Sequence, residues 1–125
     1  TSIIANSYGA YLLTSAFINK PAIASQVLLL SPLLGLTLVE EEKFYSRPPN
    51  QRSWSEALEQ GRMTKPSYLE VCAGELDGGA CSPTVVLEFS ELIKADQVQL
   101  IPEQGHQLDR SIVQAAIGEF LAQNS

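Results

Sequence analysis

The sequence has 125 residues, of which 45% are hydrophobic and 18% charged, so it can bury one core of modest size and lacks the composition of a disordered tail. The formal net charge of −6 and the scattered lysines and arginines disfavour nucleic acid as a partner, because a phosphate backbone is bound by cations gathered on one face. The two cysteines suit neither a zinc site nor a disulfide framework, which favours a cytoplasmic protein with reduced thiols, and no metal ion or cofactor is expected.

The first part of the chain alternates between strand-like and helical segments. Apolar residues predict a strand at Ser2–Asn6, a helix from Tyr8 to Asn19 and a second strand at Gln26–Leu30. Pro21 ends the helix, because proline cannot donate the backbone hydrogen bond that a continuing helix needs. The apolar stretches are too short or too interrupted to cross a bilayer, so no membrane span is expected.

The start of the chain is typical of the interior of a fold rather than of a free terminus. The sequence begins at Thr1 without a methionine, and an apolar strand follows at once. Such a strand at a sheet edge presents unpaired backbone groups that invite association. We therefore expect the chain to be a fragment, or to pair through this strand with a missing N-terminal segment or with another chain.

Residues 35–66 interrupt the alternation. This stretch is polar and contains prolines, which predicts an insertion or lid-like excursion within the domain. One helix is expected in it, opened by a capping box of Ser53 and Glu56 and ended by Gly61. Three aromatic residues either line a substrate pocket or pin the excursion to the body of the protein, and pinning is favoured because an inserted segment needs apolar anchors. They are Phe44, Tyr45 and Trp54.

The last part of the chain returns to alternation. A strand is predicted at Ser67–Ala73, a helix with Ser82 as N-cap and Pro83 as its first residue, a strand at Gln97–Ile101 and a final helix. Apolar residues at helical spacing should face the sheet, namely Val85, Phe89, Leu92 and Ile93 in one helix and Ile112, Val113, Ala116, Ile117, Phe120 and Leu121 in the other. The pattern predicts a single α/β domain over residues 1–125, with a parallel sheet of about four strands and flanking helices.

Candidate chemistry begins where the first strand meets the first helix. The segment Ala5-Asn6-Ser7-Tyr8-Gly9 matches the nucleophile-elbow motif G-x-S-x-G, with alanine in the first glycine position. The motif holds a serine at the tip of a tight turn, and small residues on both sides let neighbouring backbone pass closely. Ser7 is then at a helix N-terminus, which favours developing negative charge, and the Tyr8 backbone N–H can donate to an oxyanion.

A serine hydroxyl needs a base and an orienting acid before it is a good nucleophile near neutral pH. His106, the only histidine, follows the last predicted strand in a glycine-containing loop. Asp77 follows the preceding strand, at the end of the turn Gly74-Glu75-Leu76-Asp77. Because the carboxyl ends of parallel strands meet at one edge of a sheet, we expect Ser7, Asp77 and His106 to form a catalytic triad.

Together these segments resemble the α/β-hydrolase superfamily. The run Val27-Leu28-Leu29-Leu30-Ser31-Pro32 is similar to the family's strand after the nucleophile helix, the Asp77 turn resembles its acid turn, and Gly105-His106 resembles its histidine loop. The resemblance implies the C-terminal half of an α/β-hydrolase fold, from the nucleophile elbow onward, with a second oxyanion donor supplied by an earlier part of the fold. It also implies a carboxylesterase- or lipase-like serine hydrolase, which cleaves an ester or thioester of a small-molecule acyl substrate through an acyl-enzyme. The alternative is a non-catalytic fragment that acts in association with another chain.

The chosen residues also have plainer interpretations. Ser7 could simply cap the helix that follows it, and His106 could be a surface histidine in a loop. Cys72 and Cys81 are interpreted as small buried residues rather than as reactive thiols. The acid could instead be one of three other carboxylates: Glu75, Asp96 or Asp109.

Overall fold

Four strands and four helices alternate along the part of the chain that the structure describes. The structure is a computed structural model, and it describes residues 2–18, 26–32, 34, 50–76 and 82–123. In chain order the elements are β1 (Ser2–Asn6), α1 (Tyr8–Ala16), β2 (Gln26–Leu30), α2 (Asn50–Glu59), β3 (Tyr68–Gly74), α3 (Pro83–Ile93), β4 (Gln97–Ile101) and α4 (Arg110–Gln123).

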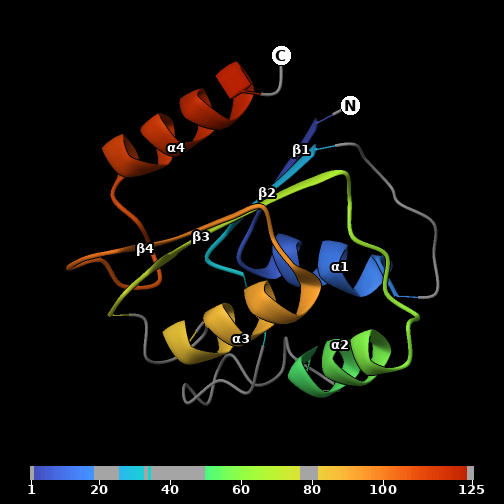
Figure 1. Ribbon diagram of the computed structural model, residues 1–125. Coiled ribbons are helices and arrows are strands. Elements are labelled where there is room, and N and C mark those ends of the chain that lie inside the picture. The colour runs from blue at the N-terminus through green and yellow to red at the C-terminus, as the bar shows by residue number, and fades with distance from the viewer. Residues whose placement is uncertain (1, 19–25, 33, 35–49, 77–81, 124–125) are drawn as a thin grey trace.

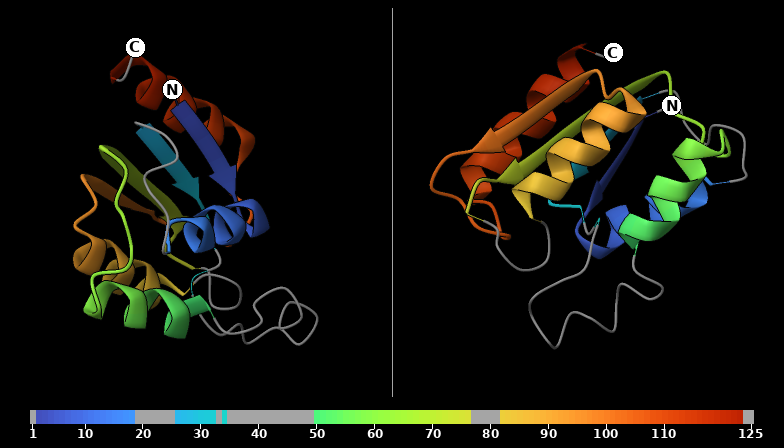
Figure 2. Two further views of the ribbon diagram at one scale, coloured as in Figure 1. Left: turned by 90° about the vertical axis from the view of Figure 1, so that its right-hand side faces the viewer. Right: turned by 60° about the horizontal axis from the view of Figure 1, so that its bottom comes forward.

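The sheet is parallel, and its spatial order β1-β2-β3-β4 is the order of the chain. Helix α4 covers one face, while α1, α2 and α3 lie on the other (Figures 1 and 2). Because every pair of neighbouring strands is parallel, all four strands run in one direction and their carboxyl ends share one edge. The α/β class and the four-stranded parallel sheet predicted from the sequence are confirmed.

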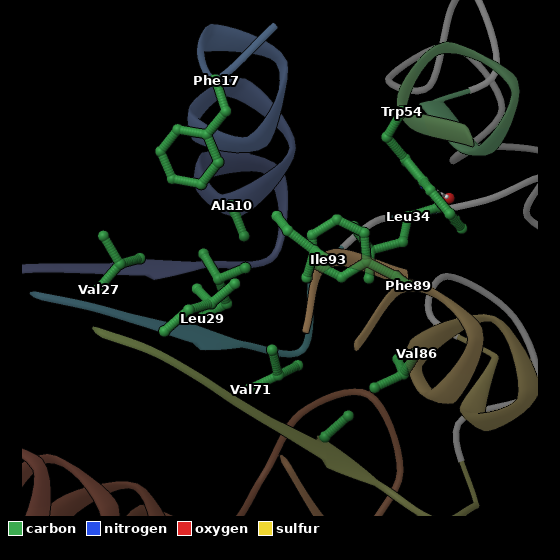
Figure 3. Packing of buried hydrophobic residues seen from close by; sticks show 12 residues of the cluster. Ala10, Phe17, Val27, Leu29, Leu34, Trp54, Val71, Val86, Phe89 and Ile93 are labelled. Atoms are coloured by element: carbon green, nitrogen blue, oxygen red, sulfur yellow. Dashed lines mark hydrogen bonds between the residues drawn. The ribbon is translucent and has the colours of Figure 1, made fainter. Parts of the chain in front are cut away.

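The two central strands are buried on both faces, which explains their continuous apolar sequences. On one face, Val27 and Leu29 of β2 pack with Phe17 near the end of α1 and Phe89 of α3 (Figure 3). On the other face, a smaller cluster joins strand residues to α4, and its buried members are Leu28, Leu30, Cys72, Leu108, Ala116 and Phe120. Each fully buried large apolar side chain contributes roughly 1.5–3 kcal/mol, so these clusters hold the helices on the sheet.

Trp54 anchors α2 to the body of the protein. Its side chain is fully buried, and its ring meets Phe89 edge-on with centroids 5.2 Å apart. The indole N–H donates to the Leu34 carbonyl oxygen at 2.6 Å (Figure 3). Trp54 therefore holds α2 against the body of the protein, as expected of an anchoring aromatic residue, while Phe44 and Tyr45 lie outside the described residues.

Strand bounds follow the sequence closely and helix bounds less so. Strands β1, β2 and β4 have their predicted bounds, and β3 begins and ends one residue later than expected. Helix α1 stops at Ala16 because the Phe17 N–H bonds the Thr14 carbonyl in a tighter turn, after which Ile18 pairs with Met63. The predicted end at Asn19 lies outside the described residues. Helix α2 begins at Asn50, before the expected cap at Ser53, and the chain leaves it through Gly61 at φ 69°.

The buried faces of α3 and α4 differ in part from the predicted stripes. Helix α3 buries Val86, Phe89, Ser90 and Ile93, whereas Leu92 is 49% exposed. The buried positions follow helical spacing and include the polar Ser90, and Leu92 lies beside this buried face rather than on it. In α4, Leu121 is 45% exposed because it is one residue, about 100° of rotation, beyond the buried Phe120. Ser82 precedes α3 in an extended conformation but makes no side-chain cap bond, so its capping role is not seen.

Strand β1 forms one edge of the described sheet. Its residues alternate in exposure, and Ile4 is 38% exposed on the face that carries α4. The helix therefore leaves this strand partly uncovered. None of the helices in the described ranges has both the length and the apolar content that crossing a bilayer requires.

Candidate active site

The candidate residues gather at the carboxyl edge of the sheet. Ser7 directly follows β1, Ser31 follows β2, Glu75 follows β3, and the loop 102–109 that carries His106 follows β4. In open α/β sheets this is the edge at which ligands bind, because loops from neighbouring strands converge there.

Ser7 is at a sharp turn between strand and helix. Its φ of 53° is left-handed, a conformation that costs energy for any residue other than glycine. Its N–H donates to the Leu30 carbonyl at 2.9 Å, and its own carbonyl accepts the Tyr11 N–H at 3.1 Å as α1 begins. The backbone is thus tied to β2 on one side and to α1 on the other, with the hydroxyl at the tip of the turn.

The structure brings Ser7 and His106 together across 99 residues of sequence: Ser7 Oγ lies 2.8 Å from His106 Nε2. An N-cap serine usually has an extended backbone and turns its hydroxyl toward the helix, whereas Ser7 is left-handed and contacts the imidazole. His106 is half-buried rather than a freely exposed loop residue. The geometry therefore favours a nucleophile and base over the two plainer interpretations.

The histidine loop is fastened to the turn after β3. Glu75 N–H donates to the Ile101 carbonyl at 2.9 Å, and Leu76 N–H donates to the Gln104 carbonyl at 2.8 Å. The Gln104 side chain also accepts the Asp109 N–H at 2.8 Å, which ties the loop to the start of α4. These bonds fix the loop on both sides of the imidazole.

Gly74 allows this close approach between the end of β3 and the histidine loop. A Cβ built at Gly74 would lie 2.2 Å from the Gly105 carbonyl oxygen and 2.4 Å from that of Gln104. Both atoms belong to the backbone, so a side chain at this position would displace the loop. In the sequence, Gly74 is the first residue of the predicted acid turn. A glycine is expected there for its turn conformation alone, so its packing role could not be recognised.

Ser31 is the second residue whose role the sequence did not indicate. In the sequence it is simply part of the run that resembles the family's strand after the nucleophile helix. In the structure its hydroxyl donates to the His106 carbonyl oxygen at 2.7 Å.

The predicted acid, Asp77, lies outside the described residues, and so does Cys81. One of the alternatives can be excluded, because Asp96 precedes β4 and lies at the opposite edge of the sheet from Ser7. There it accepts hydrogen bonds from Lys65 and the Leu69 N–H, both at 2.8 Å, and the Lys65 bond holds its pKa below the usual value.

The other two alternative acids are both at the right edge of the sheet. Glu75 directly follows β3 and is exposed, and Asp109 directly precedes α4, with its carboxylate 3.2 Å from the Gln104 side-chain amide. Asp109 is thus engaged in bracing the loop rather than in orienting a ring.

The remaining parts of the elbow are Tyr8 and Gly9. Tyr8 is the first residue of α1, so its N–H belongs to the first turn, where the helix dipole favours negative charge. Its ring stacks on Tyr11 with centroids 5.7 Å apart. A Cβ at Gly9 would meet nothing within 4 Å, so the close backbone passage expected there does not occur in the described structure.

A hollow of about 600 Å³ opens beside Ser7 and His106. Its walls mix apolar side chains from β2 and α4 with polar ones, and they comprise Asn6, Leu30, Gln107, Leu108, Arg110, Val113 and Gln114. A volume of this order suits a small organic molecule.

Neither thiol nor metal chemistry is indicated by the residues seen. Among the described His, Cys, Asp and Glu side chains, no group of three is placed to hold a metal ion. Cys72 is buried within β3, and burial, followed by the nearby Glu70 carboxylate, raises the pKa of its thiol to about 11. A thiol that stays protonated is a poor nucleophile.

Comparison with known proteins identifies the fold. No protein-family model and no curated protein sequence matches the chain. Among solved structures, it is similar to a monoacylglycerol lipase from Paleococcus ferrophilus, with a TM-score of 0.74 and 12% identity over 99% of this chain and 68% of the lipase. It is also similar to acetyl xylan esterase 1 from Thermoanaerobacterium sp. JW/SL YS485, with a TM-score of 0.64 and 18% identity over 99% of this chain and 45% of the esterase. Dipeptidyl peptidase 4 from Porphyromonas gingivalis gives a TM-score of 0.66 and 16% identity over 98% of this chain and 19% of the peptidase.

These likenesses show the fold of the chain. The chain has part of an α/β-hydrolase fold, which it shares with lipases, esterases and peptidases. The matched part includes nearly the whole chain, from the elbow strand to the last helix, but only about a fifth to two thirds of the solved proteins. At these identities the likeness shows the fold, and the chemistry must be argued from the site.

Proposed function

We propose that the chain carries the nucleophile and base of a serine hydrolase that cleaves an ester or thioester of a small acyl substrate. The observation that supports this most is the 2.8 Å contact between Ser7 Oγ and His106 Nε2, at the tip of a strained turn between strand and helix. A serine held in this way, with a base on the neighbouring loop, is the arrangement required for nucleophilic acyl transfer.

In the proposed reaction, Ser7 Oγ attacks the substrate carbonyl carbon while His106 Nε2 takes the hydroxyl proton. The resulting imidazolium gives that proton to the departing alcohol or thiol, which leaves an acyl group esterified to Ser7. Water then attacks the acyl-enzyme with His106 again as base, and the acid product departs. Nε2 can accept a proton only if Nδ1 carries one, so the mechanism needs an acceptor facing Nδ1, and we assign that place to Asp77.

Negative charge that develops on the carbonyl oxygen needs hydrogen-bond donors. We assign one to the backbone N–H of Tyr8, which lies at the positive end of α1 directly after the nucleophile. A second donor from another part of the fold would complete the oxyanion hole. Loss of one such donor typically slows the chemical step about 10²- to 10³-fold, so activity of this chain by itself should be low if that donor is supplied elsewhere.

Labelling with a fluorophosphonate probe tests the proposal, because an activated serine displaces fluoride from the probe and becomes phosphonylated. The chain should be labelled, and Ser7→Ala should abolish labelling while leaving the far-UV circular dichroism unchanged. Ser111→Ala, which removes an exposed hydroxyl from α4, is the matched control and should label normally. Equal labelling of the Ser7→Ala variant and the unaltered chain would remove Ser7 from the mechanism. A comparison of the turnover rates of p-nitrophenyl acetate and of an anilide would separate ester cleavage from amide cleavage.

A second proposal concerns association through β1. Within the described sheet this strand pairs on one side only, and the exposed apolar residues Ile4, Tyr8 and Leu12 lie on it and on α1. An edge of this kind favours pairing with a further strand, from another segment of the same protein or from another chain. Sedimentation velocity tests association of the chain with itself, which Ile4→Lys should weaken. If the unaltered chain is a monomer at all concentrations, self-association is excluded and β1 would pair with another segment of the same protein or with a different chain.

A further inference from the structure

Ser31 is held in an unusual place at the end of β2. It is 1% exposed and has a φ of 45°, the left-handed conformation. Its N–H donates to the Cys72 carbonyl at 2.8 Å, so its backbone is fixed to β3. Its hydroxyl donates to the His106 carbonyl oxygen at 2.7 Å, across 75 residues of sequence.

Leu30, the residue before Ser31, binds the backbone of the candidate nucleophile, Ser7. The Leu30 carbonyl accepts the Ser7 N–H at 2.9 Å. Two consecutive residues, the last of β2 and the one that follows it, therefore bind the backbone of Ser7 and the backbone of His106. The two supports are joined by one planar peptide unit, so they lie close together beneath the 2.8 Å contact between Ser7 Oγ and His106 Nε2.

The backbone conformation by itself does not require a serine. Glycine adopts a left-handed φ without the steric cost that any Cβ brings. What serine adds at this position is a donor, buried and satisfied by the His106 carbonyl. The contact is made with the backbone carbonyl of His106 and not with its ring, so it restrains the loop that carries the imidazole.

We infer that Ser31 is a positioning residue, whose hydroxyl clamps the histidine loop to β2 and keeps the imidazole within hydrogen-bonding distance of Ser7. The inference rests on the proposed function of Ser7 and His106. Removing the clamp frees the loop on the β2 side while its bonds to the turn after β3 remain. A displacement of about 1 Å in a reacting group costs on the order of 10²-fold in rate, so labelling should slow about 10- to 100-fold.

The test uses the fact that the sequence contains a single histidine. Its imidazole gives one set of signals in ¹H–¹⁵N correlation spectra, so the Nε2 environment can be followed without any catalysis. The variants are Ser31→Gly and Ser31→Ala. Both remove the hydroxyl, but only glycine also relieves the strain of the left-handed backbone. Ser7→Ala is the reference for a lost Oγ–Nε2 contact, and Ser111→Ala on the surface of α4 is the control.

We expect the Nε2 signal of both Ser31 variants to move toward that of Ser7→Ala, and fluorophosphonate labelling to slow in both. Because glycine relieves the strain, an equal effect in both variants assigns it to the missing hydroxyl. Unchanged Nε2 signals and labelling rates in folded variants would overturn the inference. If the unaltered chain is not labelled but the Nε2 signal still moves in the variants, the clamp stands and the proposed function fails.

A folding defect is handled by a third variant. If the glycine and alanine variants do not fold, Ser31→Cys keeps nearly the same volume and a weaker S–H donor. An Nε2 signal between those of the unaltered chain and Ser7→Ala supports the clamp. A signal and labelling rate equal to those of the unaltered chain overturn it.

Discussion

Substitution of Gly74 by alanine should damage the site from a position that touches no substrate. Gly74 is the last residue of β3, buried beneath the loop that carries His106. A Cβ there would lie 2.2 Å from the Gly105 carbonyl oxygen, 2.4 Å from the Gln104 carbonyl oxygen and 2.7 Å from the Gln104 carbonyl carbon. All of these atoms belong to the backbone, so no side-chain rotation can make room.

The size of the effect follows from the distances. Carbon and carbonyl oxygen do not normally approach closer than about 3.3 Å, so the 2.2 Å contact requires a movement of about 1 Å in β3 or in the loop. Overpacking of this kind costs roughly 1–3 kcal/mol of stability. If the loop moves, His106 moves with it, and a misplacement of about 1 Å should slow the reaction with a fluorophosphonate about 100-fold.

The assay combines urea unfolding, followed by circular dichroism, with the rate of fluorophosphonate labelling. Gly118→Ala is the matched control, because Gly118 lies within α4 and a Cβ there would meet nothing within 4 Å. This control should be as stable as the unaltered chain or more so, since alanine favours helix by up to about 1 kcal/mol over glycine. A Gly74→Ala variant with unaltered stability and labelling would refute the close packing of the end of β3 against the histidine loop.

Two further predictions concern pH. The pKa of Cys72 rises from 9.0 to about 11, so the folded chain keeps a proton that the unfolded chain loses; this stabilisation is complete below about pH 9 and lost as pH rises toward 11. Between about pH 8 and pH 10 the unaltered chain should lose about 1 kcal/mol more stability in urea unfolding than Cys72→Ala, and an equal loss in both would contradict the assignment. The pKa of Asp96 is lowered, chiefly by Lys65, so its contribution is present at neutral pH and lost as pH falls through that pKa. Because the Lys65 and Asp96 side chains are both partly exposed, Asp96→Asn should lower the free energy of unfolding by under about 1 kcal/mol at neutral pH. A difference in stability from the unaltered chain that does not shrink in acid would refute the role of the carboxylate.

The fold could be predicted because its signals are local. The continuous apolar run of β2 indicates a strand buried on both faces, and turn residues mark each strand end. From four parallel strands in chain order, the convergence of Ser7 and His106 at one edge follows without knowledge of any contact. The predicted face of α3 was wrong in part because a buried Ser90 takes a place in the stripe that an apolar residue was expected to fill.

The supports of the site could not be predicted, because their meaning depends on segments far apart in the chain. Ser31 and His106 are 75 residues apart, and nothing around Ser31 in the sequence distinguishes a clamp from an ordinary strand end. Gly74 likewise appears in the sequence as a turn glycine, whereas its neighbour in space is Gly105. Periodicity and turn chemistry report how a segment folds, but they do not report which other backbone will pass beside it.

Backbone strain gives an independent reason to regard this edge of the sheet as functional. Among the described residues, the left-handed conformations without glycine are at Ser7, Ser31, Glu103 and Lys94. Lys94 is an ordinary helix C-cap, whose N–H bonds carbonyls of α3. The other three follow the carboxyl ends of β1, β2 and β4, and each such conformation costs on the order of 1–3 kcal/mol. In a domain whose net stability is roughly 5–15 kcal/mol, strain of that size at one edge persists only where hydrogen bonds such as those of Ser7 and Ser31 fix the backbone, and it is concentrated where the candidate nucleophile and base meet.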